Sequence, residues 1–575
     1  MLQVTLTYLL IFALAWPVGQ YLARLLRGGR TFSDRIYGPI ERPIMALLGV
    51  NPERGMSLSG YVKAFLWSHL ALGIFALLVF MFQNLLPFNP DAIPGMRWDV
   101  ALHTSISFLT NTNQQHYSGQ AQLSYFSQLA GIVGLQIFTP AAGIAVLAAV
   151  LRGMFGGRSK VPEGSNADLG NFYSDTLKVM LRVMVPLCLA LSLLFTSQGV
   201  PATWSGAIKA VPLDQSAGMA EQVIPLGPVA PMIATKQLGT NGGGWYGPNS
   251  AVPLENPTPI SNLAQVAAIV LLPVACVFML TGFTGRRRLT ALVFGSMAIL
   301  SVSLTALNVW SERGANAATT GLATEVGMQR GNMEGKEQRF GTDSSALWAS
   351  FTTQSSNGSV NAMHDSLNPW AGVGTQTGMI MNLVWGGAGC GLIGFLVYLW
   401  LSVFLAGLMV GRTPELYGRK LAIADMRWLS MIVVAQPLFV LTATAIALGF
   451  PEYTGNSNPG MHGLAQVFYE YTSAYANNGS GFEGLGDGTP FWNISTSILL
   501  LAGRLIALLV PLLIAARLAE KRVAPVSAGT LNIETFSFAF ALLSVIVLVN
   551  LLCFLPALAL GSLGEALSLQ ALPGR

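Results

Sequence analysis

Long apolar runs alternate with polar loops along most of the chain. A helix needs about 20 mostly apolar residues to cross a bilayer. Such runs occur at residues 2–26, 62–86, 124–151, 177–198, 263–283, 290–310, 377–405, 428–449, 494–517 and 535–559. The pattern therefore predicts an all-α polytopic membrane protein with about ten transmembrane helices.

The first apolar run is predicted to be an uncleaved helix with its N-terminus outside. A signal peptide carries its positive charge before the apolar stretch. Here Arg24, Arg27 and Arg30 follow that stretch instead.

Basic residues fall in alternate loops, which orients the other helices. The basic positions are Arg24, Arg27, Arg30, Arg35 and Arg42; Arg152, Arg158 and Lys160; Arg286, Arg287 and Arg288; Arg412, Arg419, Lys420 and Arg427; and Arg517, Lys521 and Arg522. The long loops between them are poor in positive charge, and residues 450–493 contain no Lys or Arg. Positive loops remain in the cytoplasm, so the long loops are expected outside.

Composition supports this class of protein. Of 575 residues, 52% are hydrophobic and only 10% charged, and the mean hydropathy is +0.54. Soluble domains carry about 25% charged residues. The net charge of +5 lies in loops, and we predict no nucleic-acid binding from it. The four cysteines lie inside apolar runs without CxxC spacing and are expected to be small buried hydrophobes: Cys188, Cys276, Cys390 and Cys553.

Four outer loops share one design, a semi-apolar stretch followed by a small polar run. They are "ALHTSISFLTNTNQ" (101–114), "MIATKQLGTNGGG" (232–244), "LWASFTTQSSNGS" (347–359) and "FYEYTSAYANNGSG" (468–481). Matching Asn113, Asn241, Asn357 and Asn478 gives a repeat of roughly 120 residues, longer than a solenoid unit. The predicted divisions are 1–60 (first helix and linker), repeats at 61–160, 161–288, 289–426 and 427–530, and a final helix with the C-terminus at 531–575.

The polar runs are candidates for the selectivity filter of a pore. Irregular backbone at membrane depth lines a water-filled path or is buried in protein. A half-helix that stops inside the membrane directs its negative end inward, and glycine lets the following backbone turn carbonyl oxygens toward a cation. The predicted filter residues are Asn111, Thr112, Asn113, Thr240, Asn241, Gly242, Gly243, Ser356, Asn357, Gly358, Asn477, Asn478 and Gly479.

Simpler interpretations exist for any one of these loops. A single Gly-rich loop is most often a plain turn. "GTNGGG" could be a phosphate cradle, but it lacks the GK[ST] ending and follows no soluble strand. Four such runs in register between spanning helices favour a pore.

The wording of the motifs resembles one family. "TNTN" (110–113), "GTNGGG" (239–244), "VNAMHDS" (360–366) and "NNGSGF" (477–482) are similar to KdpA, the potassium-translocating subunit family of the bacterial Kdp ATPase. The resemblance covers nearly the whole chain and implies an N-terminal helix plus four M1–P–M2 repeats around a pseudo-fourfold pore. Gln114 and Asn357 depart from the family pattern, where tryptophan and cysteine are usual.

The resemblance also implies partners. It indicates a non-catalytic subunit in the bacterial inner membrane that binds extracytoplasmic potassium and passes it to a KdpB-like P-type ATPase subunit, with KdpC-like and KdpF-like small subunits. The chain itself carries no Walker loop or aspartyl-phosphorylation signature, so ATP would be used by the partner. A self-sufficient, gradient-driven Trk or Ktr transporter is the alternative. A redox subunit is disfavoured because no helix carries paired haem-ligand histidines.

Two features lie below the predicted filter. The run "WGGAGCGLIGF" (385–395) indicates either close helix packing or a helix break that acts as a gate through Gly386, Gly387, Gly389 and Gly391. Arg504 falls mid-helix, where it either pairs with an acid or a carbonyl or presents fixed charge to the ion path.

The remaining polar features are expected to be structural. Lys236 should point behind its pore helix, paired with an acid. Four histidines, whose scattered spacing fits no metal site, are expected to be surface residues: His103, His116, His364 and His462. The 311–345 loop should form an outer cap or vestibule wall.

Overall fold

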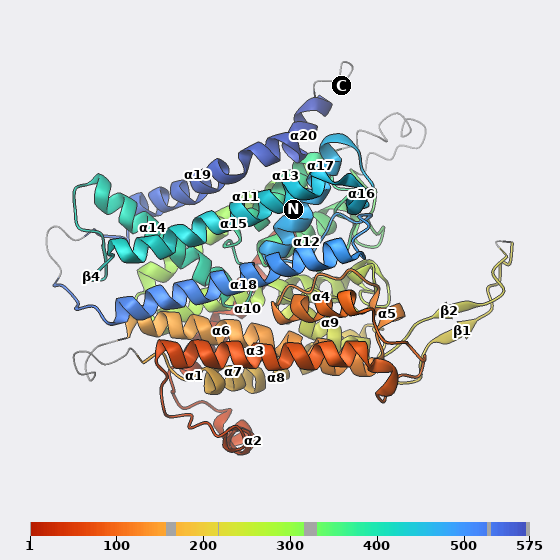
Figure 1. The fold of residues 1–575 in the computed structure, drawn as a ribbon, viewed down its shortest axis with the longest axis horizontal. Helices are drawn as coiled ribbons and strands as arrows, with labels where there is room; N and C mark the ends of the chain where they lie inside the picture. Colours follow the sequence, from red (N-terminus) through yellow and green to blue (C-terminus); the bar gives the residue numbers. More distant parts are fainter. Residues whose placement is uncertain (1, 157–167, 217, 315–330, 526–530, 571–575) are drawn as a thin grey trace.

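The computed structural model of the chain describes residues 2–156, 168–216, 218–314, 331–525 and 531–570. Within these residues, ten helices are long and apolar enough to cross a membrane. The predicted class, an all-α polytopic membrane protein, is confirmed. Figure 1 shows the long helices running side by side through one bundle.

The spanning helices follow the predicted apolar runs closely. They are α1 (Leu2–Leu26), α3 (Leu58–Met81), η2 (Ser127–Val133) continued by α6 (Gly134–Phe155), α7 (Phe172–Val179) with η3 (Met180–Met184) and α8 (Val185–Ser197), α10 (Pro259–Thr284), α11 (Arg287–Arg313), α14 (Cys390–Met409), α15 (Ile423–Gly449), α18 (Pro490–Ala519) and α19 (Phe536–Leu560). The first helix, α1, packs along α10.

Four shorter helices stop just before the four polar runs. They are α4 (Trp98–Leu109), α9 (Val229–Leu238), α12 (Gly341–Gln354) and α17 (Gly460–Tyr475). All four lie in the half of the bundle from which the hairpin β1–β2 extends (Figure 1). Each directs its carbonyl end at a polar run, so the negative ends of four helix dipoles face these segments.

One helix that was predicted to be continuous is interrupted. The run 377–405 forms α13 (Pro369–Met381) and α14, separated by irregular backbone. Asn382, Gly386 and Gly389 adopt left-handed φ angles of 45°, 61° and 84° there, which an α-helix cannot contain. The break at the Gly-rich run is therefore confirmed, and the single long helix is not.

Some elements carry no strong hydropathy signal and were not predicted. They are α2 (Asp34–Leu47), α5 (Gly119–Gln122), α16 (Pro451–Thr454), α20 (Ser562–Gln570), η1 (Gln83–Leu85), η4 (Asn249–Ala251), the antiparallel pair β1 (Ile208–Ala210) and β2 (Gln222–Ile224), and the pair β3 (Glu415–Leu416) and β4 (Arg419–Lys420). Helix α2 is held by Arg182, whose guanidinium contacts Asp34 and Glu41.

The basic loops gather at one end of the bundle. Arg152 donates to the carbonyl of Leu26, Arg419 donates to the carbonyl of Gly153, and Arg286 pairs with Glu534 at 3.1 Å. Figure 1 places β4 at the end opposite the β1–β2 hairpin. Arg158 and Lys160 lie outside the described residues. Basic loops that are far apart in the sequence thus contact one another at this end.

Candidate ion-binding site

The four polar runs repeat one backbone pattern, left-handed at two positions separated by a single residue. The pairs of φ angles are 67° and 58° at Asn111 and Asn113, 52° and 88° at Thr240 and Gly242, 53° and 81° at Ser356 and Gly358, and 52° and 103° at Asn477 and Gly479. The repeat aligns the four segments residue by residue.

This register corrects the first segment by one position. Thr112, and not Asn113, is equivalent to Asn241, Asn357 and Asn478. Asn113 instead takes the place that glycine occupies in the other three segments. Asparagine is among the few residues with a Cβ that enter the left-handed region readily, so it conceals the glycine position in the sequence.

Hydrogen bonds connect the segments into a closed ring. The first contacts the second, the third contacts the second, and the fourth contacts both the third and the first. The donors are Asn111 Nδ2 to the Thr240 carbonyl (2.8 Å), Asn357 Nδ2 to the Lys236 carbonyl (3.1 Å), Asn478 Nδ2 to the Thr352 carbonyl (2.7 Å) and Asn477 Nδ2 to Thr112 Oγ1 (3.0 Å). The asparagine side chains therefore brace neighbouring segments.

Glycine is required where adjacent segments touch. A Cβ on Gly242 would overlap the carbonyl oxygen of Asn357, one on Gly358 that of Asn478, and one on Gly479 that of Thr112. Asn357, Asn478 and Thr112 occupy the same central position in their segments. Each glycine thus lies against the central carbonyl of a neighbouring segment.

Those central carbonyls have no internal hydrogen bond. Among the described residues, no donor reaches the carbonyl oxygens of Thr112, Asn241, Asn357 or Asn478, although all four residues are fully buried. Buried carbonyls are nearly always paired, because leaving one unpaired costs about 1–3 kcal/mol. Four unpaired carbonyls at equivalent positions of one ring form a ligand set suited to a desolvated cation.

The ring separates two cavities. The outer cavity, of about 870 Å³, is lined by Asn113, Gly242, Gly358 and Gly479, which are the outer left-handed positions. The inner cavity, of about 90 Å³, is lined by the inner positions Asn111, Ser356 and Asn477. The inner cavity is by far the smaller of the two. The ring therefore lies between these two spaces.

Adjacent glycines in "GTNGGG" have different roles. Gly242 lies at the segment contact, whereas Gly243 is not left-handed. A Cβ on Gly243 would lie 2.7 Å from the ring of Phe108 and 2.8 Å from the Cβ of Asn113. Gly243 is therefore needed for close packing beside the first segment.

Two supporting residues were missed by the sequence analysis. Gln136 Nε2 donates to Asn113 Oδ1 (2.9 Å) and to the Gly243 carbonyl (3.1 Å). Asn249 Nδ2 donates to the Gly242 carbonyl (2.7 Å). Gln136 had a detectable signal, because a polar residue inside an apolar spanning run is usually functional or paired. Asn249 sits in an ordinary polar loop and had none.

Lys236 lies behind its pore helix, as predicted. Its ammonium contacts Glu255 and donates to Asn249 Oδ1 (2.6 Å) and Ser250 Oγ (2.7 Å). Lys236 and Glu255 are both fully buried. The carboxylate compensates a charge that would otherwise repel cations at the second segment.

The broken helix lies directly below the ring. Ser356 Oγ donates to Asn382 Oδ1 (2.8 Å), and the Ala388 backbone N–H donates to Thr240 Oγ1 (3.0 Å). Gly387 lines the inner cavity.

The other glycines of the break fill tight contacts. A Cβ on Gly386 would overlap Gly391, one on Gly389 would overlap the carbonyl of Gly143, and one on Gly391 would overlap the carbonyl of Trp385. The irregular loop is therefore seated firmly between the ring and α6.

Arg504 lines the same inner cavity and is only 4% exposed. Its guanidinium donates to the carbonyl of Thr139 (2.9 Å) and to Sγ of Cys390 (3.0 Å). In the described part of the chain it forms no ion pair, so its charge is uncompensated. The expected carbonyl pairing is present, and it leaves the positive charge facing the cavity below the ring.

The histidines differ from expectation. His103, which lies in α4, His116 and His364 are buried, with exposures of 0%, 5% and 1%. Only His462 is partly exposed. His116 also meets two carboxylates far away in sequence, Glu470 and Asp487. The prediction of surface histidines is wrong for the three buried ones.

The outer cavity has an acidic wall. Glu483 and Asp487 line it, and burial raises the pKa of Glu483 to about 7. Gln114, one of the two departures from the family pattern, donates its amide to Glu470 in this wall. Lys336 and Glu337 of the predicted outer cap also line the cavity, whereas residues 315–330 of that loop lie outside the described residues.

The fold and the ring define a polytopic membrane protein in which four half-helices present irregular backbone between two cavities. The family described as "KdpA: Potassium-transporting ATPase A subunit" matches residues 5–567. The chain belongs to this family.

Full-length relatives support the assignment. The chain is 42% identical over 572 residues to a protein of Gloeobacter violaceus, covering 98% of this chain and 97% of that protein. It is 43% identical over 554 residues to a protein of Pseudomonas aeruginosa, covering 96% of each. Both are named potassium-transporting ATPase potassium-binding subunit.

Proposed function

We propose that the chain is the potassium-binding subunit of an ATP-driven potassium importer. The observation that carries this proposal is the ring of four buried carbonyls without internal hydrogen bonds, at Thr112, Asn241, Asn357 and Asn478. Carbonyl oxygens can replace the hydration shell of a potassium ion. The four half-helix ends add negative potential at the same place.

The ion would enter from the acidic outer cavity and leave through the inner one. The basic ends of the helices would face the cytoplasm of a bacterial inner membrane, and the half-helices would face outside. The 30–42, 410–427 and 517–525 regions are too short to hold an ATPase domain, so ATP would be hydrolysed by a KdpB-like P-type partner. KdpC-like and KdpF-like chains would complete the complex.

Below the ring, Arg504 and the broken helix would control the ion's exit. The uncompensated guanidinium of Arg504 raises the energy of a cation in the inner cavity. The firmly seated loop at 382–389 narrows the same route. Together they would prevent leak straight to the cytoplasm and favour transfer to the partner subunit.

Reconstitution tests this function. The chain would be purified with its co-expressed partners, inserted into liposomes, and assayed for ⁸⁶Rb⁺ uptake with and without ATP, alongside liposomes that contain the chain alone. Uptake that needs both ATP and the partner subunits is expected. Uptake by the chain alone that follows the ion gradient would instead indicate a Trk-like or Ktr-like transporter.

A further inference from the structure

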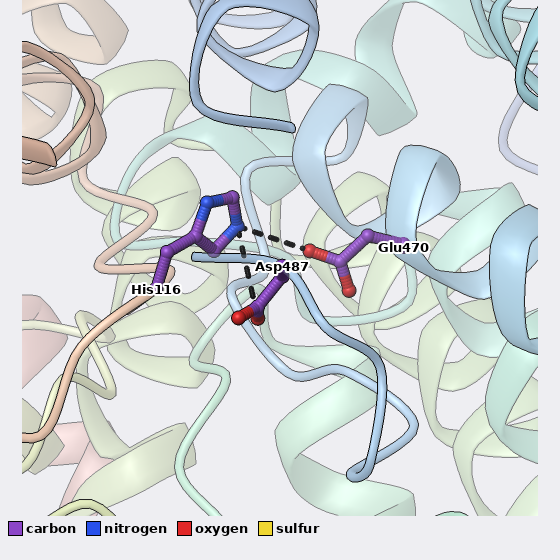
Figure 2. A group of neighbouring side chains, drawn as sticks. All are labelled: His116, Glu470 and Asp487. Carbon is purple, nitrogen blue, oxygen red and sulfur yellow. Dashed lines mark hydrogen bonds and ion pairs between the residues drawn. The ribbon is translucent and has the colours of Figure 1, made fainter. Parts of the chain in front are cut away.

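Three side chains from distant parts of the sequence meet in the wall of the outer cavity. His116 follows the first filter segment, Glu470 lies in α17, and Asp487 lies in the loop after the fourth segment. Figure 2 shows the His116 ring edge directed toward both carboxylates. One ligand atom from each residue lies within 4.8 Å of the other two.

The hydrogen bonds around His116 fix which ring nitrogen faces the carboxylates. Asn493 Nδ2 donates to Asp99 Oδ2 (2.9 Å), so the Asn493 amide oxygen is directed to His116. That oxygen lies 2.7 Å from Nδ1, which must therefore carry a hydrogen. In the neutral ring, the Nε2 lone pair then faces Glu470 and Asp487. Histidines that bind metals typically donate the N–H of their other ring nitrogen to an acceptor, as His116 does here.

The carboxylates lack another positive partner. Within the described ranges, the only ion-pair contacts of Glu470 and Asp487 are with His116, at 3.3 and 4.0 Å. The nearby Arg97 is paired with Asp99 and donates to the Gly488 carbonyl. Glu470 is only 2% exposed, and a buried carboxylate is stabilised by a nearby cation.

The spacing suits a small divalent metal. Zinc binds histidine nitrogen and carboxylate oxygen at about 2.0–2.2 Å, so tetrahedral ligands lie about 3.3–3.6 Å apart. The separations from His116 Nε2 to the two carboxylates are 3.3 and 4.0 Å, and all three ligand atoms lie within 4.8 Å of one another, so an ion would draw the carboxylates closer together.

The site is also supported and accessible. Gln114 donates to Glu470, as a second layer of residues around a metal often does. The side chain of Asp487 is 33% exposed and opens to the outer cavity, which provides an entry path.

We propose that His116, Glu470 and Asp487 form a binding site for a zinc-class divalent metal ion in the outer vestibule, separate from the potassium ring. One imidazole and two carboxylates leave a fourth position open to the cavity, for water or another ligand. The nitrogen ligand favours Zn²⁺ over Mg²⁺, which prefers oxygen ligands. This proposal does not depend on potassium transport.

His462 offers a matched control. It also contacts two carboxylates, Glu565 through Nδ1 at 3.0 Å and Asp365 through Nε2 at 3.1 Å. The two carboxylates lie at opposite nitrogens of the His462 ring. One metal ion bound to either nitrogen therefore could not also bind both carboxylates. The two histidines therefore have similar composition around them but different geometry.

The test measures metal binding by the full chain, purified with its complex in detergent and stripped with a chelator. Zn²⁺ affinity would be measured by competition with a chromophoric chelator in excess Mg²⁺, and Co²⁺ would report coordination through its visible spectrum. We expect the wild type to compete with the chelator for one Zn²⁺ ion per chain. Asp487→Asn and His116→Gln should each weaken Zn²⁺ binding at least about tenfold and change the Co²⁺ bands, while His462→Gln should change neither.

Size-exclusion profiles would show that each variant is folded. Because Asp487 is partly exposed whereas His116 is buried, Asp487→Asn is the milder change, and it keeps the test valid if His116→Gln misfolds. The proposal is overturned if the wild type shows no saturable Zn²⁺ binding, in which case His116 serves only as a protonated partner. It is equally overturned if folded Asp487→Asn binds Zn²⁺ and Co²⁺ as the wild type does.

Discussion

Gly358→Ala tests the close contacts of the ring most sharply. Gly358 has φ 81°, and an added Cβ would overlap the carbonyl oxygen of Asn478 and lie 2.9 Å from the carbonyl carbons of Asn478 and Gly479. Because these neighbours are backbone atoms, the fourth segment must move. The central Asn478 carbonyl is then displaced from the ring.

The expected magnitude follows from the loss of one ligand. A hydrogen bond or similar contact to a charged group contributes about 1.5–3 kcal/mol. At 1.4 kcal/mol for each factor of ten, displacement of one carbonyl should weaken cation binding about 10- to 150-fold. The left-handed backbone adds about 1–2 kcal/mol of strain, which acts on folding stability.

Gly341→Ala separates these two effects. Gly341 lies in the same repeat with φ 72°, but nothing lies within 4 Å of its added Cβ. Both variants should lose stability, and only Gly358→Ala should lose affinity. The assay is equilibrium binding of ⁸⁶Rb⁺ to the purified complex, with potassium as competitor. Affinity of folded Gly358→Ala within twofold of that of Gly341→Ala would refute the reasoning.

Four further changes test other parts of the structure. Gly387→Ala adds a methyl group that lines the inner cavity, with no neighbour closer than 3.6 Å. Because it narrows the exit without touching the ring, the uptake rate should fall while ⁸⁶Rb⁺ affinity stays constant. A fall in affinity alone would place Gly387 in the binding site. Arg504→Gln should increase passive ⁸⁶Rb⁺ leak or lower the uptake per ATP in liposomes, and unchanged leak and coupling would remove the charge from this role. Glu255→Gln leaves the buried Lys236 charge unpaired and should destabilise the chain by about 3–5 kcal/mol, seen as a lower melting temperature in detergent; melting like the wild type contradicts this. Asp365 and Glu565 raise the pKa of His462 to about 10. The folding stability that protonated His462 provides is therefore complete below pH 6.5 and lost as pH rises toward 10. His462→Gln should remove this pH dependence of the melting temperature, and an unchanged pH profile would contradict it.

The membrane fold could be predicted because hydropathy reports spanning helices directly. The bilayer requires apolar runs of a given length, and all the predicted runs except 377–405 become spanning helices with small shifts at their ends. The helix break was also predictable, because Gly386 and Gly389 are weak helix formers that adopt left-handed angles. Helix α2 is too short and polar to give a spanning-helix signal. It is held in place by the ion pairs of Arg182 with Asp34 and Glu41.

The candidate site was predictable in place but not in detail. The polar runs identified the right segments, yet the first was misaligned because Asn113 occupies a glycine position. The meeting of His116 with Glu470 and Asp487 could not be read from spacing, because these residues are brought together only by the packing of the first and fourth segments. Sequence periodicity reports local structure, whereas such clusters depend on long-range contacts.

Anomalous diffraction from crystals of the purified complex grown with Tl⁺ in place of K⁺ tests the central claim most directly. Thallium is a large monovalent cation whose anomalous signal locates it without reference to the protein. A peak enclosed by the carbonyl oxygens of Thr112, Asn241, Asn357 and Asn478 is predicted, between the outer and inner cavities. Strong Tl⁺ peaks elsewhere in the chain with none inside this ring would contradict the account.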